Sequence, residues 1–353
     1  MSIRDLDWSS WLDRTSGEGT KWLLWGLDNM IWPIVVVTFV IFAILMPQVF
    51  TSASNIQFML YSSAGLGALV LAESLCLLSG NFDLSIGSIA GFSSMVTALF
   101  LNTWFPGTPG LVGVVLILFI GGAIGFVNGV SIGYFGINPF LQTLAFFIIF
   151  RGAVFLLSTI TVAPLPESYL FVGGALIGDL PGLGGADSLW IFGGIPIAVP
   201  LIIALYAGVW FIMNYRRIGL AIMAVGGDEN AAEEAGIPRE RVLLIVFTAS
   251  GVLSGLAGLL YTGYLSAAPP GLAEGDLFPA FAGAVIGGIS LDGGRGDIKN
   301  AFGGMFLLTM IQVGLVQVGV GGDAIQFING LVLLVAIYLY TTESKIRHRL
   351  LST

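Results

Sequence analysis

The sequence predicts an all-α integral membrane protein with about ten transmembrane helices, some of them broken or short. Of the 353 residues, 56% are hydrophobic and only 10% are charged, and the apolar residues form long continuous runs. The mean hydropathy of +0.95 agrees with this pattern. In a soluble domain roughly a quarter of the residues would be charged, so this composition excludes a soluble fold. The 50 glycines suit helices that approach closely within lipid.

Ten apolar runs match or approach the roughly 20 residues that cross a bilayer. Several are short or interrupted by glycine, and the eighth is the weakest because it contains Pro279 and Gly283. The predicted spans are 31–46, 56–78, 84–103, 111–133, 138–158, 196–213, 241–263, 277–291, 299–319 and 324–341. They define a transmembrane domain over residues 31–341.

The basic residues predict which loops face the cytoplasm, because cytoplasmic loops are enriched in Lys and Arg. They gather before the first span, after the sixth, after the eighth and after the tenth. The residues are Arg4, Arg14, Lys21, Arg216, Arg217, Arg239, Arg241, Arg295, Lys299, Lys345, Arg347 and Arg349. Both termini of this multi-pass cell-membrane protein are therefore expected in the cytoplasm. The acidic segment 159–195, rich in Gly and Pro and without Lys or Arg, is expected outside.

The terminal segments are expected to lie outside the bilayer core. Residues 1–30 contain four tryptophans with leucines between them, a composition that suits an interfacial helix on the cytoplasmic surface. A mobile leader with incidental aromatic residues is the alternative. Residues 342–353 form a cytoplasmic tail.

The cytoplasmic loop 215–241 is more ordered in pattern than a simple connector requires. Alanines favour short helices, Gly226-Gly227 interrupts them, and Gly236-Ile237-Pro238 ends them. We interpret the loop as a docking surface for a cytosolic partner.

Three charged residues lie at or near membrane depth: Glu73, Asp83 and Arg151. Each would cost several kcal/mol facing lipid, so each is expected to face protein or a water-filled cavity. Asp83 with Ser85 has the pattern of a helix start, and Glu73 or Asp83 is an expected partner of Arg151. These groups border a substrate pathway, or they form structural ion pairs and caps.

Further polar residues of the spans extend this candidate pathway. Asn138, Gln142 and Thr143 begin the fifth span, and such groups can bond a sugar or bond between helices.

Several kinds of chemistry are excluded by missing residues. The chain has no Gly-x4-Gly-Lys-Ser/Thr motif, so it carries no P-loop ATPase of its own. One cysteine, Cys76, permits no disulfide framework or cysteine metal site, and one histidine, His348, lies in the tail. We therefore expect no enzyme activity, no metal site and no bound cofactor in this chain.

Four stretches in order resemble the permease subunits of ABC importers for monosaccharides of the ribose, xylose and galactose type. They are NFDLSIGS (81–88), YFGINPFLQTLAFFIIFRG (134–152), GLAIMAVGGDENAAEEAGIP (219–238) and FAGAVIGGISLDGGRG (281–296). The resemblance runs from about Asn55 to Leu339. The chain departs from the family at Asn81-Phe82, where Gly-Ile is usual, and at Gln312-Val313, where Asn-Asn is frequent.

The resemblance implies the larger, type II-like ABC importer permease fold and a four-part importer. Its expected partners are a cytoplasmic ABC ATPase dimer that binds ATP and Mg, a second permease subunit of the same or another kind, an extracytoplasmic sugar-binding protein and membrane lipid. No nucleic acid partner is expected. Nucleosides or a furanosyl signalling molecule are alternative substrates, and an ion-coupled secondary transporter is the alternative from another class.

Two sets of residues are assigned roles, the coupling set from the resemblance and the pathway set from the residues in and near the spans. The implied ATPase-coupling residues are Gly219, Ala224, Gly226, Gly227, Asp228, Glu229, Asn230 and Ala231. The candidate translocation pathway comprises Asp83, Ser85, Asn138, Phe140, Gln142, Thr143 and Arg151.

Overall fold

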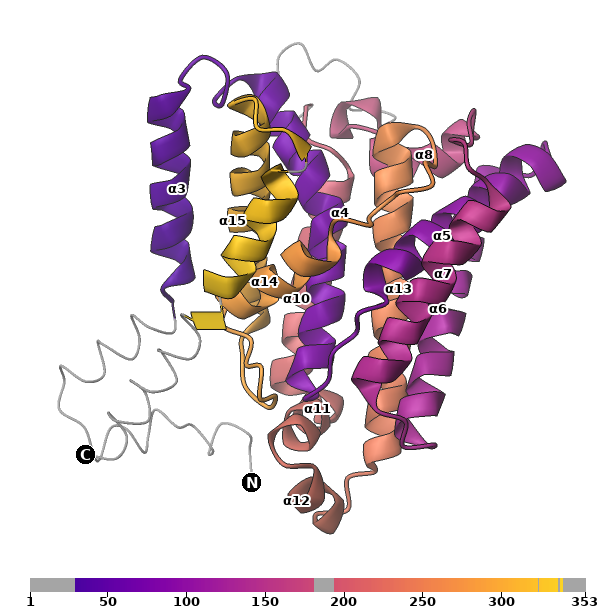
Figure 1. The fold of residues 1–353 in the computed structure, drawn as a ribbon, viewed down its shortest axis with the longest axis vertical. Helices are drawn as coiled ribbons and strands as arrows, with labels where there is room; N and C mark the ends of the chain where they lie inside the picture. The colour runs from indigo at the N-terminus through magenta and orange to yellow at the C-terminus, as the bar shows by residue number, and fades with distance from the viewer. Residues whose placement is uncertain (1–28, 181–193, 323, 336, 339–353) are drawn as a thin grey trace.

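The computed structural model is a bundle of helices that lie side by side, and it describes residues 29–180, 194–322, 324–335 and 337–338 (Figure 1). The expected N-terminal interfacial helix and the tail 342–353 fall outside the described residues. Seven helical segments are long and apolar enough to cross a membrane. They are α4 (Ala53–Leu78), α5 (Ile86–Leu99) with the π-helical turn η2 (Phe100–Trp104), α6 (Gly110–Gly133), α7 (Pro139–Leu157), α10 (Ala198–Tyr215), α13 (Arg239–Leu265) and α15 (Ile298–Gln317).

Three shorter apolar helices occupy the remaining predicted spans. They are α3 (Ile31–Leu45), α14 (Leu277–Ile286) and Ala324–Val335. No strand is present in the described part of the chain, where Val162 with Ala268 and Leu176 with Pro196 form isolated bridges. The predicted all-α membrane fold with short and broken spans is therefore confirmed.

Contacts between distant segments define the two ends of the bundle. At one end, the Gly294 N–H donates to the Leu78 carbonyl at 3.0 Å, and Trp32 Nε1 donates to Asn300 Oδ1 at 3.2 Å. At the other end, Gln57 Nε2 donates to the Gly194 carbonyl at 2.9 Å. The short helices α8 (Glu167–Gly174) and η3 (Ile177–Asp179) lie at this second end. The long helices therefore alternate in direction, as the predicted spans require.

Helices α6 and α13 form the most closely packed pair, and glycines permit it. A Cβ at Gly129 would lie 2.8 Å from the Cα of Leu244, and one at Gly255 would lie 2.7 Å from the Ile117 carbonyl. Gly121 and Gly251 face each other so closely that neither site has room for a side chain. This is the small-residue packing that suits helices in lipid, where no hydrophobic effect drives helices together.

Helix α5 without its π-helical turn has 14 residues and α14 has 10, and each follows an irregular segment that lies within the bundle. Residues 79–85 rise from the end of α4 before α5 begins, and residues 266–276 descend from α13 before α14 begins, so both short helices start partway along the bundle (Figure 1). Irregular backbone at this depth is tolerated where protein or a cavity surrounds it.

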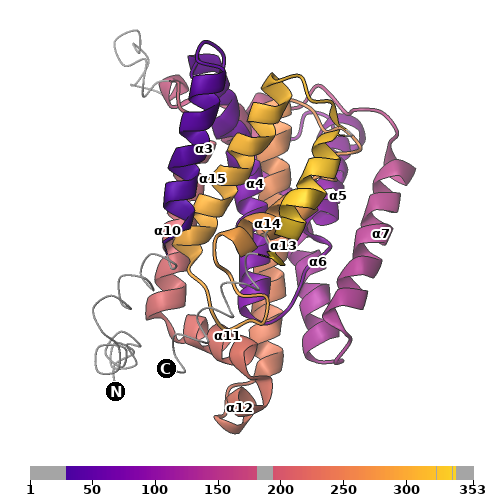
Figure 2. The ribbon, with the colours of Figure 1, turned by 60° about the vertical axis from the view of Figure 1, so that its left-hand side comes forward.

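Two short helices connect α10 to α13 and lie at the same end as Leu78 and Gly294. Helix α11 spans Arg217–Gly227 and α12 spans Glu229–Glu234. Both lie at the bottom of Figures 1 and 2, with α12 beyond the ends of the long helices.

Candidate functional site

Asp83 is the centre of a buried hydrogen-bond network within the bundle. Its side chain has no exposed surface. Oδ1 accepts from the Ser85 N–H at 3.0 Å and from the Ser85 hydroxyl, and Oδ2 accepts from the Ser250 hydroxyl of α13 at 2.8 Å. Asp83 therefore stabilises the turn before α5 and ties it to α13. The N-cap position itself belongs to Ser85, which makes no side-chain capping bond.

The network continues to two further helices. Asn128 of α6 is fully buried, and its Nδ2 donates to Ser85 Oγ at 3.1 Å. Gln142 of α7 donates to Asn128 Oδ1 at 3.4 Å. The chain of bonds from Ser250 to Gln142 thus joins α13, the break at 79–85, α6 and α7, which makes it a polar link between helices.

Glu73 of α4 is the second buried carboxyl group of this region. It is 1% exposed, and its Oε2 has no hydrogen-bond partner in the described part of the structure. The Asp83 backbone N–H is a hydrogen-bond partner of the Glu73 carboxyl, so Glu73 lies beside the Asp83 network.

The expected pairing of Arg151 with Glu73 or Asp83 is wrong. Arg151 Nε lies 3.2 Å from Glu274 Oε1, in the connection between α13 and α14. The reason is the descending path of residues 266–276, which brings an acidic residue from outside the predicted spans to the flank of α7. Arg151 and Glu274 side chains are 51% and 28% exposed, so this pair differs from the enclosed Asp83.

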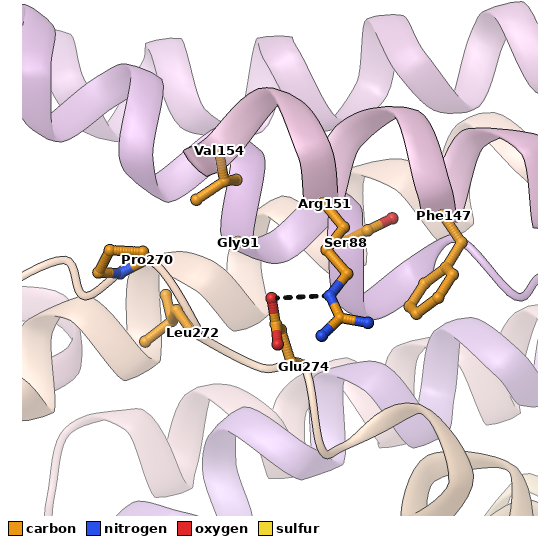
Figure 3. Close-up of a pocket in the computed structure, with 8 residues that line it drawn as sticks. All are labelled: Ser88, Gly91, Phe147, Arg151, Val154, Pro270, Leu272 and Glu274. Atoms are coloured by element: carbon orange, nitrogen blue, oxygen red, sulfur yellow. Dashed lines mark hydrogen bonds and ion pairs between the residues drawn. The ribbon is translucent and has the colours of Figure 1, made fainter. Parts of the chain in front are cut away.

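A small pocket borders this ion pair, with an enclosed volume of about 10 Å³. Figure 3 shows Arg151 and Phe147 pointing from α7 towards Glu274, with Ser88 and Gly91 of α5 behind them. Pro270 and Leu272 of the α13–α14 connection line the same pocket.

The other predicted pathway residues do not gather around this pocket. Asn138 caps α7 and accepts from the Leu141 N–H at 3.3 Å, while Phe140 in the first turn is 52% exposed. Thr143 is fully buried and donates to the Pro139 carbonyl of its own helix at 2.8 Å. The predicted set is thus divided between the α7 start, the buried network and the ion pair, and its role in transport stays a prediction.

The predicted coupling residues fall into an exposed and a packed group. Residues 227–231 are exposed where α11 meets α12. The Asp228 carboxylate caps α12 by accepting from the Ala231 N–H at 3.0 Å, and Glu229 pairs with Arg239. Gly219 is buried, and Ala224 is half-buried. The exposed group is the part that another protein can reach.

Gly226 belongs to a junction of three segments, which we call the glycine junction: Leu78–Gly80, Gly226-Gly227 and Gly293-Gly294. A Cβ at Gly226 would overlap the Leu78 carbonyl oxygen, and one at Gly294 would lie 2.6 Å from the Cα of Gly227. The end of α11 therefore packs backbone to backbone against the start of the break that leads to Asp83. The sequence contained Gly80 and the two glycine pairs but no sign that they meet.

Two site residues were missed for the same reason. Glu274 lies in a connection that the spans place outside the membrane, and Ser250 looks like an ordinary small residue of a long span. Neither has a local signal, since only the folded backbone brings each to its partner.

Comparisons with known proteins agree on one family over most of the chain. The family model described as "branched-chain amino acid transport system / permease component" matches residues 55–337. No solved structure matches the chain.

Three similar curated proteins illustrate the range of relatives. The D-allose transport system permease protein of Escherichia coli is 34% identical over 284 residues, 80% of this chain and 82% of that protein. The L-arabinose ABC transporter permease protein of Azospirillum brasilense is 31% identical over 86% of this chain and 85% of its own length. The autoinducer 2 import system permease protein of Photorhabdus laumondii is 27% identical over 89% of this chain and 90% of its own length.

Proposed function

Since the chain belongs to the branched-chain amino acid transport system / permease component family, we propose that it is the membrane permease of an ABC importer for a monosaccharide. The observation that carries this function is the family match over residues 55–337, together with relatives named for D-allose and L-arabinose. The resemblance inferred from four sequence stretches is thereby confirmed. The relative named for autoinducer 2 makes that ligand the second class to test.

The proposed mechanism is alternating access driven by separate ATPase subunits. The exposed residues 227–231 form the docking surface, and closure of the ATPases moves α11 and α12. Because Gly226 packs against Leu78 and Gly294, this movement reaches the ends of α4 and of the 287–297 turn. The broken segments beside α5 and α14 then change the access to the pathway.

The remaining partners follow from the same proposal. A second permease subunit completes the pathway, and an external binding protein delivers the solute at the end of the bundle that carries α8. ATP and Mg²⁺ are bound by the ATPase subunits, and this chain performs no bond chemistry. The basic residues near α11 and α13 support a cytoplasmic location for that end and for both termini.

Reconstitution in proteoliposomes tests the function. The permease is combined with the ATPase and the binding protein encoded in neighbouring reading frames, and uptake of labelled monosaccharides and of autoinducer 2 is measured. We expect uptake of a monosaccharide only when the binding protein is present and ATP is supplied on the side of the membrane where the ATPase lies. Uptake by the permease alone, driven by an ion gradient, would overturn the proposal in favour of a secondary transporter.

The docking surface is tested by charge reversal at the start of α12. The double variant Asp228→Lys and Glu229→Lys should lose at least about tenfold in ATP-driven uptake, because it removes the α12 cap and reverses two exposed charges. The matched control is Asp228→Asn with Glu229→Gln, since Asn retains the cap. Co-purification of the ATPase and solute taken up per ATP hydrolysed are the readouts. Normal coupling in the Lys variant would place the docking surface elsewhere.

A further inference from the structure

The position of Arg151 along α7 is the first step of the inference. Arg151 lies twelve positions after Pro139 and six before Leu157, which at 1.5 Å per residue places it about 18 Å and about 9 Å from the helix ends. Its side chain is nevertheless 51% exposed. A guanidinium at this depth is costly in lipid, so this flank of α7 faces water or another protein.

The side chains around the Arg151 pocket include hydrogen-bond donors, hydrogen-bond acceptors and an aromatic ring. Glu274 presents acceptors, Arg151 presents donors in a planar fork, and the Phe147 ring lies 6.0 Å from the guanidinium carbon. The Ser88 hydroxyl donates to the Ser85 carbonyl at 2.8 Å, which leaves its oxygen able to accept. The enclosed space is about 10 Å³, room for about one water molecule, so a solute would contact this pocket from its open side.

The backbone that carries Glu274 is held in place. Ala273, its neighbour, adopts φ 60°, a conformation that non-glycine residues seldom take and that is maintained only by the surrounding structure. Gly87 and Gly91 of α5 provide this support, because a Cβ on either would lie 2.7 Å and 2.8 Å from the Ala273 and Leu272 carbonyl oxygens. The carboxylate is therefore positioned by packed backbone as well as by its ion pair.

We propose that the pocket between Arg151, Glu274, Ser88 and Phe147 is a solute-contact site on the translocation pathway for a neutral polyhydroxylated solute. Hydroxyl groups both donate and accept, so they can bond the guanidinium and the carboxylate together, while the aromatic ring contacts the apolar face of the solute. The opposed charges cancel, which favours a neutral solute over an ionic one. This inference rests on the proposed function and names where its substrate is contacted.

The competing interpretation is an ion pair that only joins the α13–α14 connection to α7 or to a second subunit. Exchanging the two charged residues distinguishes these two interpretations. A purely structural pair tolerates Arg151→Glu with Glu274→Arg, because the attraction is retained. A solute site does not, because its donors and acceptors have changed places.

The transport test uses the complete importer in proteoliposomes. Arg151→Gln and Glu274→Gln should each reduce ATP-driven uptake at least about tenfold, the loss expected when a hydrogen bond to a charged group is removed. The exchanged double variant should remain equally impaired. Normal uptake by both single variants, or full recovery in the exchanged variant, would overturn the inference. Failure of the wild-type importer to use ATP would instead overturn the proposed function.

Water access to the pocket is measured independently of transport. Cys76 is buried and is the chain's single cysteine, so Cys76→Ala gives a thiol-free background. In that background, Arg151→Cys should react rapidly with a charged, membrane-impermeant thiol reagent. The control is Ile149→Cys, two residues from Arg151 and therefore on the opposite side of α7, at an apolar position that is 56% exposed and expected to face lipid. Equal, slow reaction at both positions would contradict an aqueous pocket.

Discussion

Asp83 and Arg151 were both predicted as charged residues at or near membrane depth, and the structure gives them opposite surroundings. Asp83 is enclosed and accepts three hydrogen bonds from two residues. Arg151 is half-exposed and has an ion pair with Glu274 at the edge of a pocket. A charge that is fully enclosed and hydrogen-bonded holds helices together, whereas an exposed charge at such depth requires water, a solute or another protein.

The largest effect is expected from Asp83→Ala. It leaves the Ser85 N–H and hydroxyl and the Ser250 hydroxyl without their acceptor in a buried site, at a cost of at least about 3 kcal/mol. The thermal unfolding midpoint of the detergent-solubilised permease should therefore fall markedly. Gln142→Ala is the control, because Gln142 is half-buried at the outer end of the same network and should cost only about 0.5–1 kcal/mol. Equal losses would contradict the distinction between enclosed and peripheral members.

The second largest loss of stability is expected at the glycine junction, where a tightly packed glycine is compared with one that has space around it. Gly226→Val places a side chain against the Leu78 carbonyl and should cost about 1–3 kcal/mol through overpacking. Gly227→Ala is the matched control, since its Cβ would have only the Gly294 Cα, at 3.9 Å, within contact range. Thermal unfolding and expression yield distinguish the two variants. A destabilised Gly227→Ala with an unaffected Gly226→Val would mean that the junction is not packed as described.

The smallest effect on stability is expected at the ion pair. Because both side chains are partly exposed, Arg151→Gln should change the free energy of unfolding by less than about 1 kcal/mol. The unfolding midpoint should therefore stay near that of the wild type, while uptake falls as proposed above. A loss of stability as large as that of Asp83→Ala would mean that Arg151, like Asp83, mainly holds the structure together.

Much of the fold and part of the site could be predicted without the structure. Continuous apolar runs predict helices, and the weak eighth run corresponds to α14, which is indeed short. The motif NFDLSIGS marks a broken segment: Gly80, immediately before it, adopts a positive φ, and α5 starts only at Ile86. The loop 215–241 is interpreted from the sequence as a docking surface, and its residues 227–231 are exposed.

The partners of the charged residues could not be predicted, because they depend on contacts across the bundle. Residues 266–276 turn back into the bundle, so Glu274 reaches an arginine 123 positions earlier in the chain. Ser250 reaches Asp83 across 167 positions.

The sequence by itself determined the class of protein, the number of candidate spans and their alternation, since these follow from hydropathy and from where basic residues lie. Only the tertiary structure decided that Asp83 is enclosed, that Arg151 pairs with Glu274 and that the three segments of the glycine junction meet beneath the break. The physical reason is that hydropathy is a property of each segment alone. Burial and hydrogen bonding are properties of several segments brought together.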